Sequence, residues 1–282
     1  MSPCLSVVIP TRDRCGILKG VLAEYLAQAG QVCAEVIVVD DGSSDGTRDL
    51  LDGISNTGIA LRWVSCPAAG PAAARNRGVA MARGPLLLFT GDDMFPQPGL
   101  LAGHVRAHGT LRRAAVLGHV RWDPAMRVSP LMRCMAPNGP LFNYRKLMRS
   151  ETGRYRFFYT ANLSMTAETL GKERFHEGFR TAAFEDAELG FRLERSGVRL
   201  VYRRELVVRH RHAMSARDMA RRLHTLRQGR EYLSTLHPEL KPSVMTRVAG
   251  RALLAAVKAW APLESLLSLE PRVPKRWTNG RL

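Results

Sequence analysis

The residues best suited to chemistry in this sequence are two adjacent carboxylates, Asp92 and Asp93. They follow an apolar run at residues 86–90 whose length and composition predict a buried strand. Adjacent carboxylates repel each other, and a divalent cation neutralises such a pair, so we expect an oxygen-ligand site of the Mg²⁺ or Mn²⁺ type. The alternative is a solvated turn that closes the strand, because acidic residues are common in turns.

The elements that must position this pair alternate between strand and helix. Apolar runs and helical periodicity predict strands at 5–9, 36–39, 59–64 and 86–90, and helices at 17–26, 47–54 and 72–81. This alternation is typical of an α/β fold with a parallel sheet, in which the carboxyl ends of the strands meet at one edge. Polar residues follow these strand ends, and we expect them to converge on one ligand-binding crevice: Thr11, Asp40, Asp41, Asp92 and Asp93. Unrelated caps at each strand end would not account for the shared edge.

Four motifs resemble, in order, those of family 2 glycosyltransferases with the GT-A fold. They are Ser6-Val-Val-Ile-Pro-Thr11, Val36-Ile-Val-Val-Asp-Asp-Gly-Ser-Ser-Asp-Gly-Thr47, Ala74-Arg-Asn-Arg-Gly78 and Phe89-Thr-Gly-Asp-Asp-Met-Phe-Pro96. The resemblance implies a GT-A type α/β fold, with a nucleotide-binding, Rossmann-like and mostly parallel sheet, to which a C-terminal helical extension is added here. It also implies a nucleotide-diphosphate sugar donor, a hydroxyl acceptor, inversion at the anomeric carbon and usually a divalent cation.

The resemblance further implies roles for the residues on the donor side. Thr11 is expected beside the nucleobase, Asp41 accepts from the ring N–H of that base, and Arg75 faces the nucleotide. Asp92 is expected to contact the ribose or the sugar, and Asp93 to hold the metal on the diphosphate. The complete donor-binding set is Pro10, Thr11, Arg12, Asp40, Asp41, Arg75, Asp92 and Asp93.

One position departs from the family pattern. The usual motif is Asp-x-Asp, and alignment through Phe89 and Pro96 places Gly91 where the first carboxylate stands. The last carboxylate, which generally binds the metal, is retained as Asp93. The loss of the first carboxylate predicts weaker metal binding, or transfer without a metal.

A second acidic pair, Glu185 and Asp186, opens a predicted helix at residues 184–193. The helix dipole stabilises carboxylates at this position, which is the simplest explanation for them. An acceptor hydroxyl, however, is a poor nucleophile until a carboxylate within hydrogen-bond reach removes its proton. The pair resembles the acceptor-side motif of the family, so we assign Asp186 as the catalytic base and expect Glu185 to orient the acceptor.

Histidines are the remaining candidates for metal ligands. His210 and His212 alternate with arginines, and a histidine after the Glu-Asp motif sometimes completes the metal shell in related GT-A enzymes. We therefore expect His210, or else His212, to join Asp93 at the metal, although a solvent-facing basic loop is an equally good interpretation. His104 and His108 have no third ligand nearby in the sequence and are expected to be structural.

The positive charge of the chain lies mostly in its second half. The formal net charge is +17 over 282 residues, but a count of Lys and Arg against Asp and Glu gives −2 for residues 1–99, +8 for 100–202 and +11 for 203–282. Because the segment that carries the Asp pair is slightly acidic, we expect no nucleic-acid partner. The basic surplus favours an anionic lipid surface or an anionic substrate instead.

We expect a GT-A domain at 5–212, a basic helical extension at 213–269 and a loose tail at 270–282. An apolar stripe opposite basic residues, which ends before Pro262, consists of Val244, Val248, Ala252, Ala256 and Trp260. Such a helix can make peripheral contact with an anionic membrane through 215–261 or dock on its own domain. No run of eighteen apolar residues predicts a membrane span, and no signal peptide is recognisable. The five scattered cysteines fit a cytoplasmic protein, at the inner face of the membrane if the helix binds lipid.

The sequence therefore predicts an inverting glycosyltransferase whose acceptor is a glycan, a lipid-linked molecule or a secondary metabolite. A sugar-1-phosphate nucleotidyltransferase is the first alternative, but it would carry a Gly-rich phosphate loop where this chain has Pro10-Thr-Arg-Asp-Arg14. A non-enzymatic membrane- or nucleic-acid-binding module is the second, and it gives Asp41, Asp93 and Asp186 no joint role.

Overall fold

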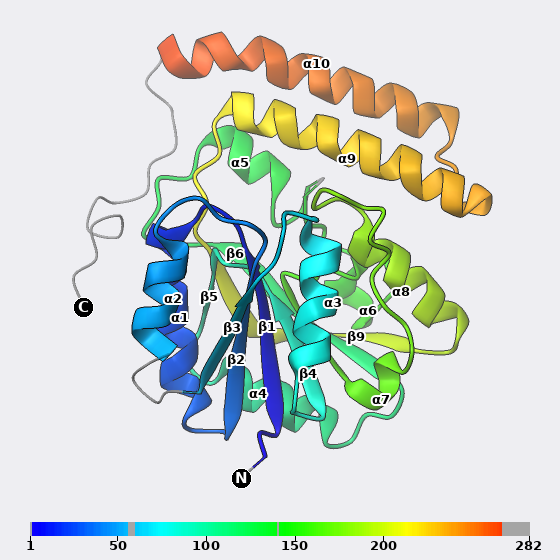
Figure 1. The fold of residues 1–282 in the computed structure, drawn as a ribbon. Helices are drawn as coiled ribbons and strands as arrows, with labels where there is room; N and C mark the ends of the chain where they lie inside the picture. The colour runs from blue at the N-terminus through cyan, green and yellow to red at the C-terminus, as the bar shows by residue number, and fades with distance from the viewer. Residues whose placement is uncertain (1, 56–59, 140, 267–282) are drawn as a thin grey trace.

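A nine-stranded sheet forms the centre of the computed structural model, which describes residues 2–55, 60–139 and 141–266 (Figure 1). Its strands are β1 (Leu5–Thr11), β2 (Ala34–Asp40), β3 (Leu61–Ser65), β4 (Leu86–Thr90), β5 (Met94–Pro96), β6 (Ala114–Trp122), β7 (Thr152–Gly153), β8 (Asn162–Thr166) and β9 (Arg199–His210). They are ordered β3-β2-β1-β4-β8-β6-β9-β5, and β7 pairs with β9.

The strand directions divide the sheet into two halves. Strands β1 to β4 are mutually parallel, as expected for the alternating amino-terminal segment. Strand β8 runs antiparallel to both β4 and β6, and β9 is parallel to β6 but antiparallel to β5 and β7. The expectation of a mostly parallel sheet is confirmed, because β1 to β4, β6 and β9 all run in one direction.

Helices cover the sheet and extend beyond it. They are α1 (Cys15–Ala29), α2 (Thr47–Ser55), α3 (Pro71–Met81), α4 (Leu100–His108), α5 (Pro130–Met135), α6 (Leu147–Ser150), α7 (Ala167–Leu170), α8 (Glu185–Arg195), α9 (Ala216–Leu236) and α10 (Val244–Leu266). Helices α9 and α10 lie side by side across the end of the sheet toward which β1 runs (Figure 1). The predicted C-terminal helical extension is thus confirmed, whereas residues 270–282 of the predicted tail lie outside the described residues.

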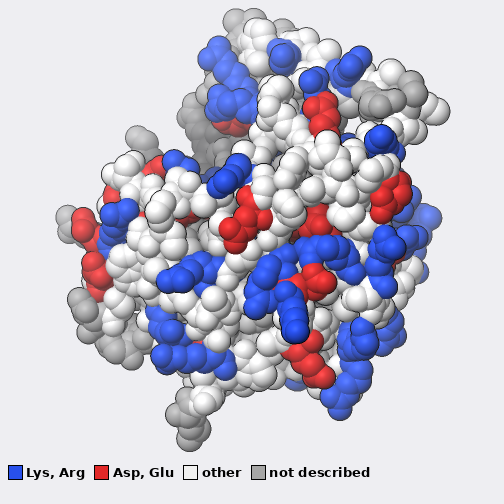
Figure 2. All heavy atoms as spheres, turned by 45° about the vertical axis from the view of Figure 1, so that its right-hand side comes forward, with Lys and Arg blue, Asp and Glu red and all other residues white. Residues whose placement is uncertain are grey.

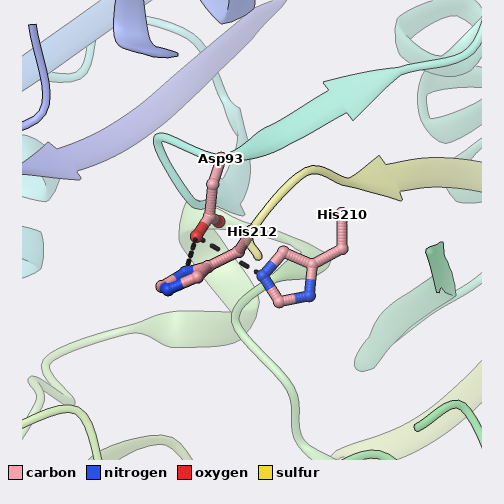
Figure 3. Close-up of side chains that lie close together, drawn as sticks. All are labelled: Asp93, His210 and His212. Atoms are coloured by element: carbon pink, nitrogen blue, oxygen red, sulfur yellow. Dashed lines mark hydrogen bonds and ion pairs between the residues drawn. The ribbon is translucent and has the colours of Figure 1, made fainter. Parts of the chain in front are cut away.

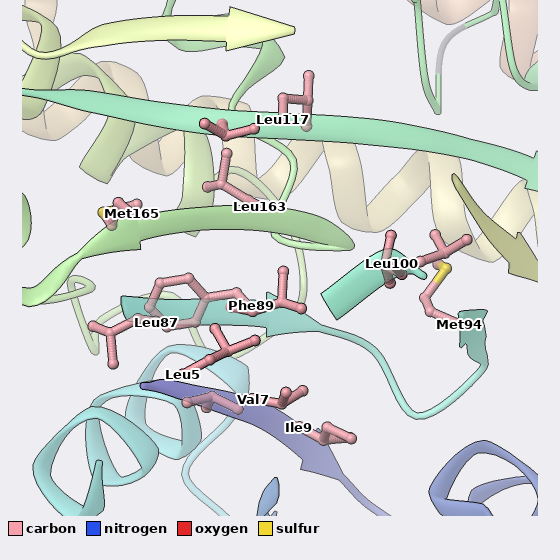
Figure 4. Close-up of a cluster of buried hydrophobic side chains, with 14 of the residues drawn as sticks. Leu5, Val7, Ile9, Leu87, Phe89, Met94, Leu100, Leu117, Leu163 and Met165 are labelled. Carbon is pink, nitrogen blue, oxygen red and sulfur yellow. The ribbon is translucent and has the colours of Figure 1, made fainter. Parts of the chain in front are cut away.

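The main core follows from the two-residue period of the strands. Successive side chains point to opposite faces of the sheet, and Figure 4 shows buried apolar ones from both faces of β1, β4, β8 and β6. Val7 and Leu88 are completely buried on one face, and Leu117, Leu163 and Met165 are completely buried on the other. These apolar layers hold the strands in register and so fix where their polar ends emerge.

Strand β9 is continuous from Arg199 to His210, although its apolar residues fall in two runs, at 200–202 and 206–208. Exposed Arg204 and Glu205 lie between these runs, and the pairing of β9 with β6 skips residues 203–206, because Tyr202 pairs with Leu117 and Val207 with His119. This register shift lets the strand continue past its polar residues.

Helix α10 docks through Leu253 and Val257, which join a buried cluster with Met132 of α5 and Met219 of α9. Val248, of the predicted apolar stripe, is 59% exposed, so the stripe does not dock on the domain at this position. The helix also continues through Pro262, where it lacks only one backbone hydrogen bond near its end. Within the described residues, no helix is both long and apolar enough to cross a bilayer.

We predict that Gly78→Ala destabilises the protein, against the usual benefit of alanine in a helix. Helix α3 approaches β1 so closely that a Cβ at Gly78 would overlap Cγ1 of Val8. Overpacking of this kind costs about 1–3 kcal/mol in the free energy of unfolding. Gly53→Ala in α2 is the matched control, because nothing lies within 4 Å of its Cβ, and it should gain roughly 0.5–1 kcal/mol. Chemical denaturation of both variants measures the difference, and equal stabilities would contradict the prediction.

Candidate active site

Asp92 and Asp93 lie in the short turn that joins β4 to β5, and both are buried. The turn is tight, because the Met94 N–H donates to the Gly91 carbonyl at 3.3 Å. A Cβ built at Gly91 lies 3.1 Å from Oδ1 of Asp93, so a side chain at this position would crowd the retained carboxylate. The glycine at the first position of the motif is therefore consistent with the local packing.

Hydrogen bonds join the ends of the first strands around this turn. The Thr11 hydroxyl of β1 donates to Oδ2 of Asp92 at 2.8 Å, and the backbone N–H of Asp41 donates to the Thr11 carbonyl at 2.9 Å. The Asp41 carboxylate accepts from the N–H groups of Ala69 and Gly70, at 2.7 and 3.0 Å, where α3 begins. The strand-end residues of β1, β2 and β4 thus lie at one edge of the sheet.

Asp40 has a different environment from Asp41. Its carboxylate is fully buried and accepts from the Ser43 N–H at 2.8 Å and from the Ser65 hydroxyl at 2.7 Å. Both contacts hold the turn after β2 and the end of β3.

Arg12, another residue of the predicted donor-binding set, lies at the surface with its side chain 55% exposed, and it contacts Asp13 at 3.7 Å.

Two histidines from β9 and the residues just after it approach Asp93 (Figure 3). Oδ2 of Asp93 lies 3.0 Å from Nδ1 of His212 and 3.4 Å from Nε2 of His210. One ligand atom from each of the three residues lies within 4.8 Å of the others, the only such group of His, Cys, Asp and Glu found in the described part of the chain. The ring of His210 is stacked on Trp122, with centroids 4.8 Å apart.

The residue between the two histidines anchors them. The backbone N–H of Arg211 donates to the Asp93 carbonyl at 2.9 Å, which fastens the end of β9 to the acidic turn. Its guanidinium lies 3.7 Å above the Phe95 ring and contacts Oδ2 of Asp123 at 2.7 Å, with both side chains almost fully buried. Successive side chains alternate in direction along an extended backbone, so this buried ion pair leaves the histidines facing Asp93.

Arg14, at the start of α1, occupies the centre of the cluster. Its Nη1 lies 2.6 Å from Oδ2 of Asp93 and 3.4 Å from Oδ1 of Asp92, and its Nη2 lies 3.0 Å from Nδ1 of His212. Burial alone would raise the pKa of Asp93, but the attraction of His210, His212 and Arg14 keeps that pKa well below its ordinary value. Burial and the charge of Asp93 raise the pKa of Asp92 to about 6.

The cluster also suits a divalent cation. It offers one carboxylate oxygen and two imidazole nitrogens, a mixture that fits Mn²⁺ better than Mg²⁺, which prefers oxygen ligands alone. His210 Nδ1 is buried and lacks a hydrogen-bond partner within the described chain. The guanidinium of Arg14 contacts the same Asp93 oxygen, so a cation bound there would compete with Arg14.

The second acidic pair lies at the first turn of α8. Glu185 is buried, and its Oε1 lies 2.9 Å from Nη1 of Arg75, which connects α8 to α3. Asp186 accepts from the Ala187 N–H at 2.8 Å. Burial, and then the charge of Glu185, raise the pKa of Asp186 to about 7 although Arg75 opposes the shift. A carboxyl with this pKa can exchange a proton near neutral pH.

The two acidic pairs face one region. The guanidinium of Arg222 in α9 lies within electrostatic reach of Glu185, Asp186 and Asp93, so it is near carboxylates of both pairs. The other predicted histidines lie elsewhere: His104 is fully buried and bonded to Ser164 and Asn162 at 2.8 and 2.9 Å. Its expected structural role is confirmed.

Several residues of the site were not predicted. Arg14 was a possible candidate, because it follows the first strand within the Pro10 to Arg14 motif. The Arg211 and Asp123 pair is 88 residues apart and had no signal in the sequence. Arg222 was one of many arginines in a basic helix, and nothing in its spacing set it apart.

Solved structures with the same fold include a mannosyltransferase. The mannosyltransferase PcManGT of Pyrobaculum calidifontis, in complex with GDP-Man and Mn²⁺, superposes with a TM-score of 0.59 at 19% identity, covering 99% of this chain and 84% of that one. S. aureus TarS 1-349 superposes with a TM-score of 0.56 at 18% identity, over 80% and 64% of the two chains. At these identities the likeness establishes the GT-A fold alone.

Sequence relatives extend over most of the chain. The validoxylamine A glucosyltransferases of Streptomyces hygroscopicus subsp. jinggangensis and subsp. limoneus are each 27% identical over 285 residues and 91% of this chain. The chain spans 66% and 62% of the length of these curated relatives. Residues 6–170, more than half of the chain, match the glycosyl transferase family 2, and the protein therefore belongs to that family.

Proposed function

We propose that this protein is an inverting glycosyltransferase that moves a sugar from a nucleotide-diphosphate donor to a hydroxyl acceptor. The observation that carries the proposal is that two groups of side chains suited to chemistry lie near the guanidinium of Arg222. Asp93, His210 and His212 could hold a cation, and Asp186 offers a carboxyl whose pKa is about 7. Relatives named as glucosyltransferases and a neighbour bound to GDP-Man and Mn²⁺ support the same reading.

On the donor side, the chain binds and neutralises the diphosphate. Asp93, His210 and His212 would hold Mn²⁺, which when bound neutralises charge on the departing nucleoside diphosphate. Arg14, which lies against the same carboxylate, is near enough to contact a phosphate oxygen after it leaves Asp93. Thr11 and Asp41, at the ends of β1 and β2, would bind the nucleoside.

On the acceptor side, Asp186 would remove the proton from the acceptor hydroxyl. The hydroxyl oxygen then attacks the anomeric carbon as the bond to the diphosphate breaks, which inverts the configuration at that carbon. Glu185 is held by Arg75 through one oxygen, while its Oε2 has no hydrogen-bond partner among the described residues and can accept from the acceptor. The ion pair thereby orients the acceptor beside the base.

We predict that Asp186→Asn lowers kcat by roughly 10²–10⁴-fold, because asparagine keeps the shape of the side chain but cannot accept the proton. Since the pKa of Asp186 is about 7, the wild-type rate should fall as the pH decreases below 7. Product formation from nucleotide sugars between pH 5 and 9 measures both effects. A variant with the wild-type rate would remove Asp186 from the mechanism.

Stability provides the control for this variant. Folding raises the pKa of this carboxyl from 3.8 to about 7, so the protein loses stability as the pH rises between these two values, where only the unfolded chain is ionised, and the loss is complete above pH 7. Asparagine avoids that cost, and the Tm of Asp186→Asn at pH 8 should equal or exceed that of the wild type. The difference should shrink as the pH falls toward about 4, where the unfolded carboxyl is also protonated.

We predict that Arg14→Gln binds Mn²⁺ more tightly than the wild type when no nucleotide is present. The guanidinium lies 2.6 Å from the ligand oxygen of Asp93, and its removal abolishes a competing positive charge. Titration of free Mn²⁺ by electron paramagnetic resonance measures the affinity directly. Arg12→Gln is the matched control, because that side chain is 55% exposed and its ion pair among the described residues is with its neighbour Asp13. Equal affinities in all three proteins would rule out the competition.

We also propose that the outward face of α10 makes peripheral contact with an anionic membrane. Met245 is 82% and Val248 is 59% exposed, two of the three large hydrophobic side chains exposed in the described chain. Arg251 and Lys258 of the same helix are exposed as well. Figure 2 shows further Lys and Arg at the upper end of the molecule, where α9 and α10 lie. Apolar side chains beside basic ones are typical of helices at lipid surfaces.

We predict that the double variant Met245→Ser and Val248→Ser lowers the partition coefficient for phosphatidylserine-containing vesicles at least about tenfold, because two apolar side chains no longer insert. Co-sedimentation at low salt measures the bound fraction. Met148→Ser, which alters a 45% exposed methionine of α6, is the control and should bind as the wild type does. Wild-type protein that stays in the supernatant would overturn this proposal.

A further inference from the structure

Helix α9 carries a face that packs on the segment leading to the catalytic pair. Arg222 and Gly229 lie on this face at helical spacing, and Gly229 is buried. The segment they meet comprises residues 176–184, immediately before Glu185. The charge of α9 suggested that this helix faces a membrane. Part of its surface instead faces the acceptor side of the proposed site.

Three consecutive residues of that segment are each contacted by α9. A guanidinium nitrogen of Arg222 donates to the Ala182 carbonyl. A Cβ built at Gly229 lies 2.5 Å from the Ala183 carbonyl oxygen, so only glycine permits this approach. The guanidinium of Arg230 lies 4.9 Å from the centre of the Phe184 ring.

Contacts on either side extend this surface along α9. The Tyr232 ring lies 4.9 Å from the Phe179 ring, earlier in the same segment. At the end of α9, Nε2 of His237 lies 3.0 Å from Oε1 of Glu188 in α8. The segment and the first turns of α8 are therefore both fastened to the one helix.

The backbone at Phe184, where the segment joins α8, needs contacts of this kind to hold it. Phe184 has a φ of 69° and lies at the N-cap of α8, where it supplies no side-chain cap. A bulky residue in the left-handed region is strained, and the conformation persists only where surrounding contacts hold it. Its position fixes the direction in which α8, and hence Asp186, begins.

We propose that α9 acts as a clamp on residues 182–184 that fixes Asp186 in its catalytic position, with Arg222 and Gly229 as positioning residues. This inference rests on the proposed function of Asp186 as the base. Neither positioning residue has to touch the sugar, because each acts through the backbone that precedes the base. The C-terminal extension is then a part of the active site.

The test is Gly229→Ala in the full chain, with Gly250→Ala of α10 as the matched control because nothing lies within 4 Å of its Cβ. Gly229→Ala should speed hydrogen exchange in peptides covering residues 181–190 at least about tenfold and lower kcat by a similar factor, because the clamp is forced open. KM for the nucleotide sugar should stay within about twofold. Gly250→Ala should change none of these quantities. Wild-type exchange and kcat in Gly229→Ala would overturn the clamp.

Arg230→Met provides a second variant in case Gly229→Ala does not fold. It removes the cation above Phe184 but leaves the close backbone approach intact, so exchange in 181–190 should rise severalfold at an unchanged Tm. Unchanged exchange in this variant would contradict the clamp. The exchange measurement is independent of sugar transfer, so failure of the clamp is distinguishable from failure of the base, which Asp186→Asn tests separately.

Discussion

Two carboxylates on adjacent residues are buried together, and this arrangement constrains the rest of the site. Moving an ionised carboxylate out of water is costly, and a second one beside it adds repulsion. The structure meets this cost by surrounding Asp93 with Arg14, His210 and His212, while Asp92 accepts from Thr11. These unequal surroundings separate the pKa values of the two carboxyls, because the pKa of Asp93 is lowered and that of Asp92 stays raised.

The groups that neutralise Asp93 come from distant parts of the chain, since Arg14 precedes α1 and the histidines lie at the end of β9. Both halves of the sheet must therefore meet at the acidic turn. The short strand β5 continues from the acidic turn and pairs with the end of β9, where Met94 lies opposite His210. The buried pair of Arg211 with Asp123 fixes that end and determines which way the histidines point. A buried ion pair contributes little net stability, and here it holds the segment that brings His210 and His212 to Asp93.

A second buried ion pair performs the equivalent task near Asp186. Arg75 of α3 and Glu185 of α8 connect the amino-terminal half of the fold to the helix that bears Asp186. The burial that this packing produces also raises the pKa of Asp186 to about 7. Helix α9 closes the same region from above, so the chain's positive extension belongs as much to the site as to the molecular surface (Figure 1).

The sequence by itself determined the fold class and the residues at the strand ends. Periodicity of two and of 3.6 depends only on local backbone geometry, so the strands carrying Thr11, Asp41 and Asp93 were predictable from their neighbours. Periodicity also predicted the helix that begins at the Glu-Asp pair, whereas the role of the pair came from its resemblance to a motif of the family. Periodicity was less informative where exposed polar residues interrupt an apolar pattern, as in β9.

Tertiary structure alone decided which of these residues meet and what each one contacts. Arg14 at the centre of the carboxylates, the anchor formed by Arg211 and Asp123, and the face of α9 that touches residues 182–184 all join segments far apart in sequence. Such contacts depend on strand order, register and helix rotation, which local patterns do not encode. The identities of the reactive groups are thus written in the sequence, whereas their protonation and their partners follow from burial and charge in the folded chain.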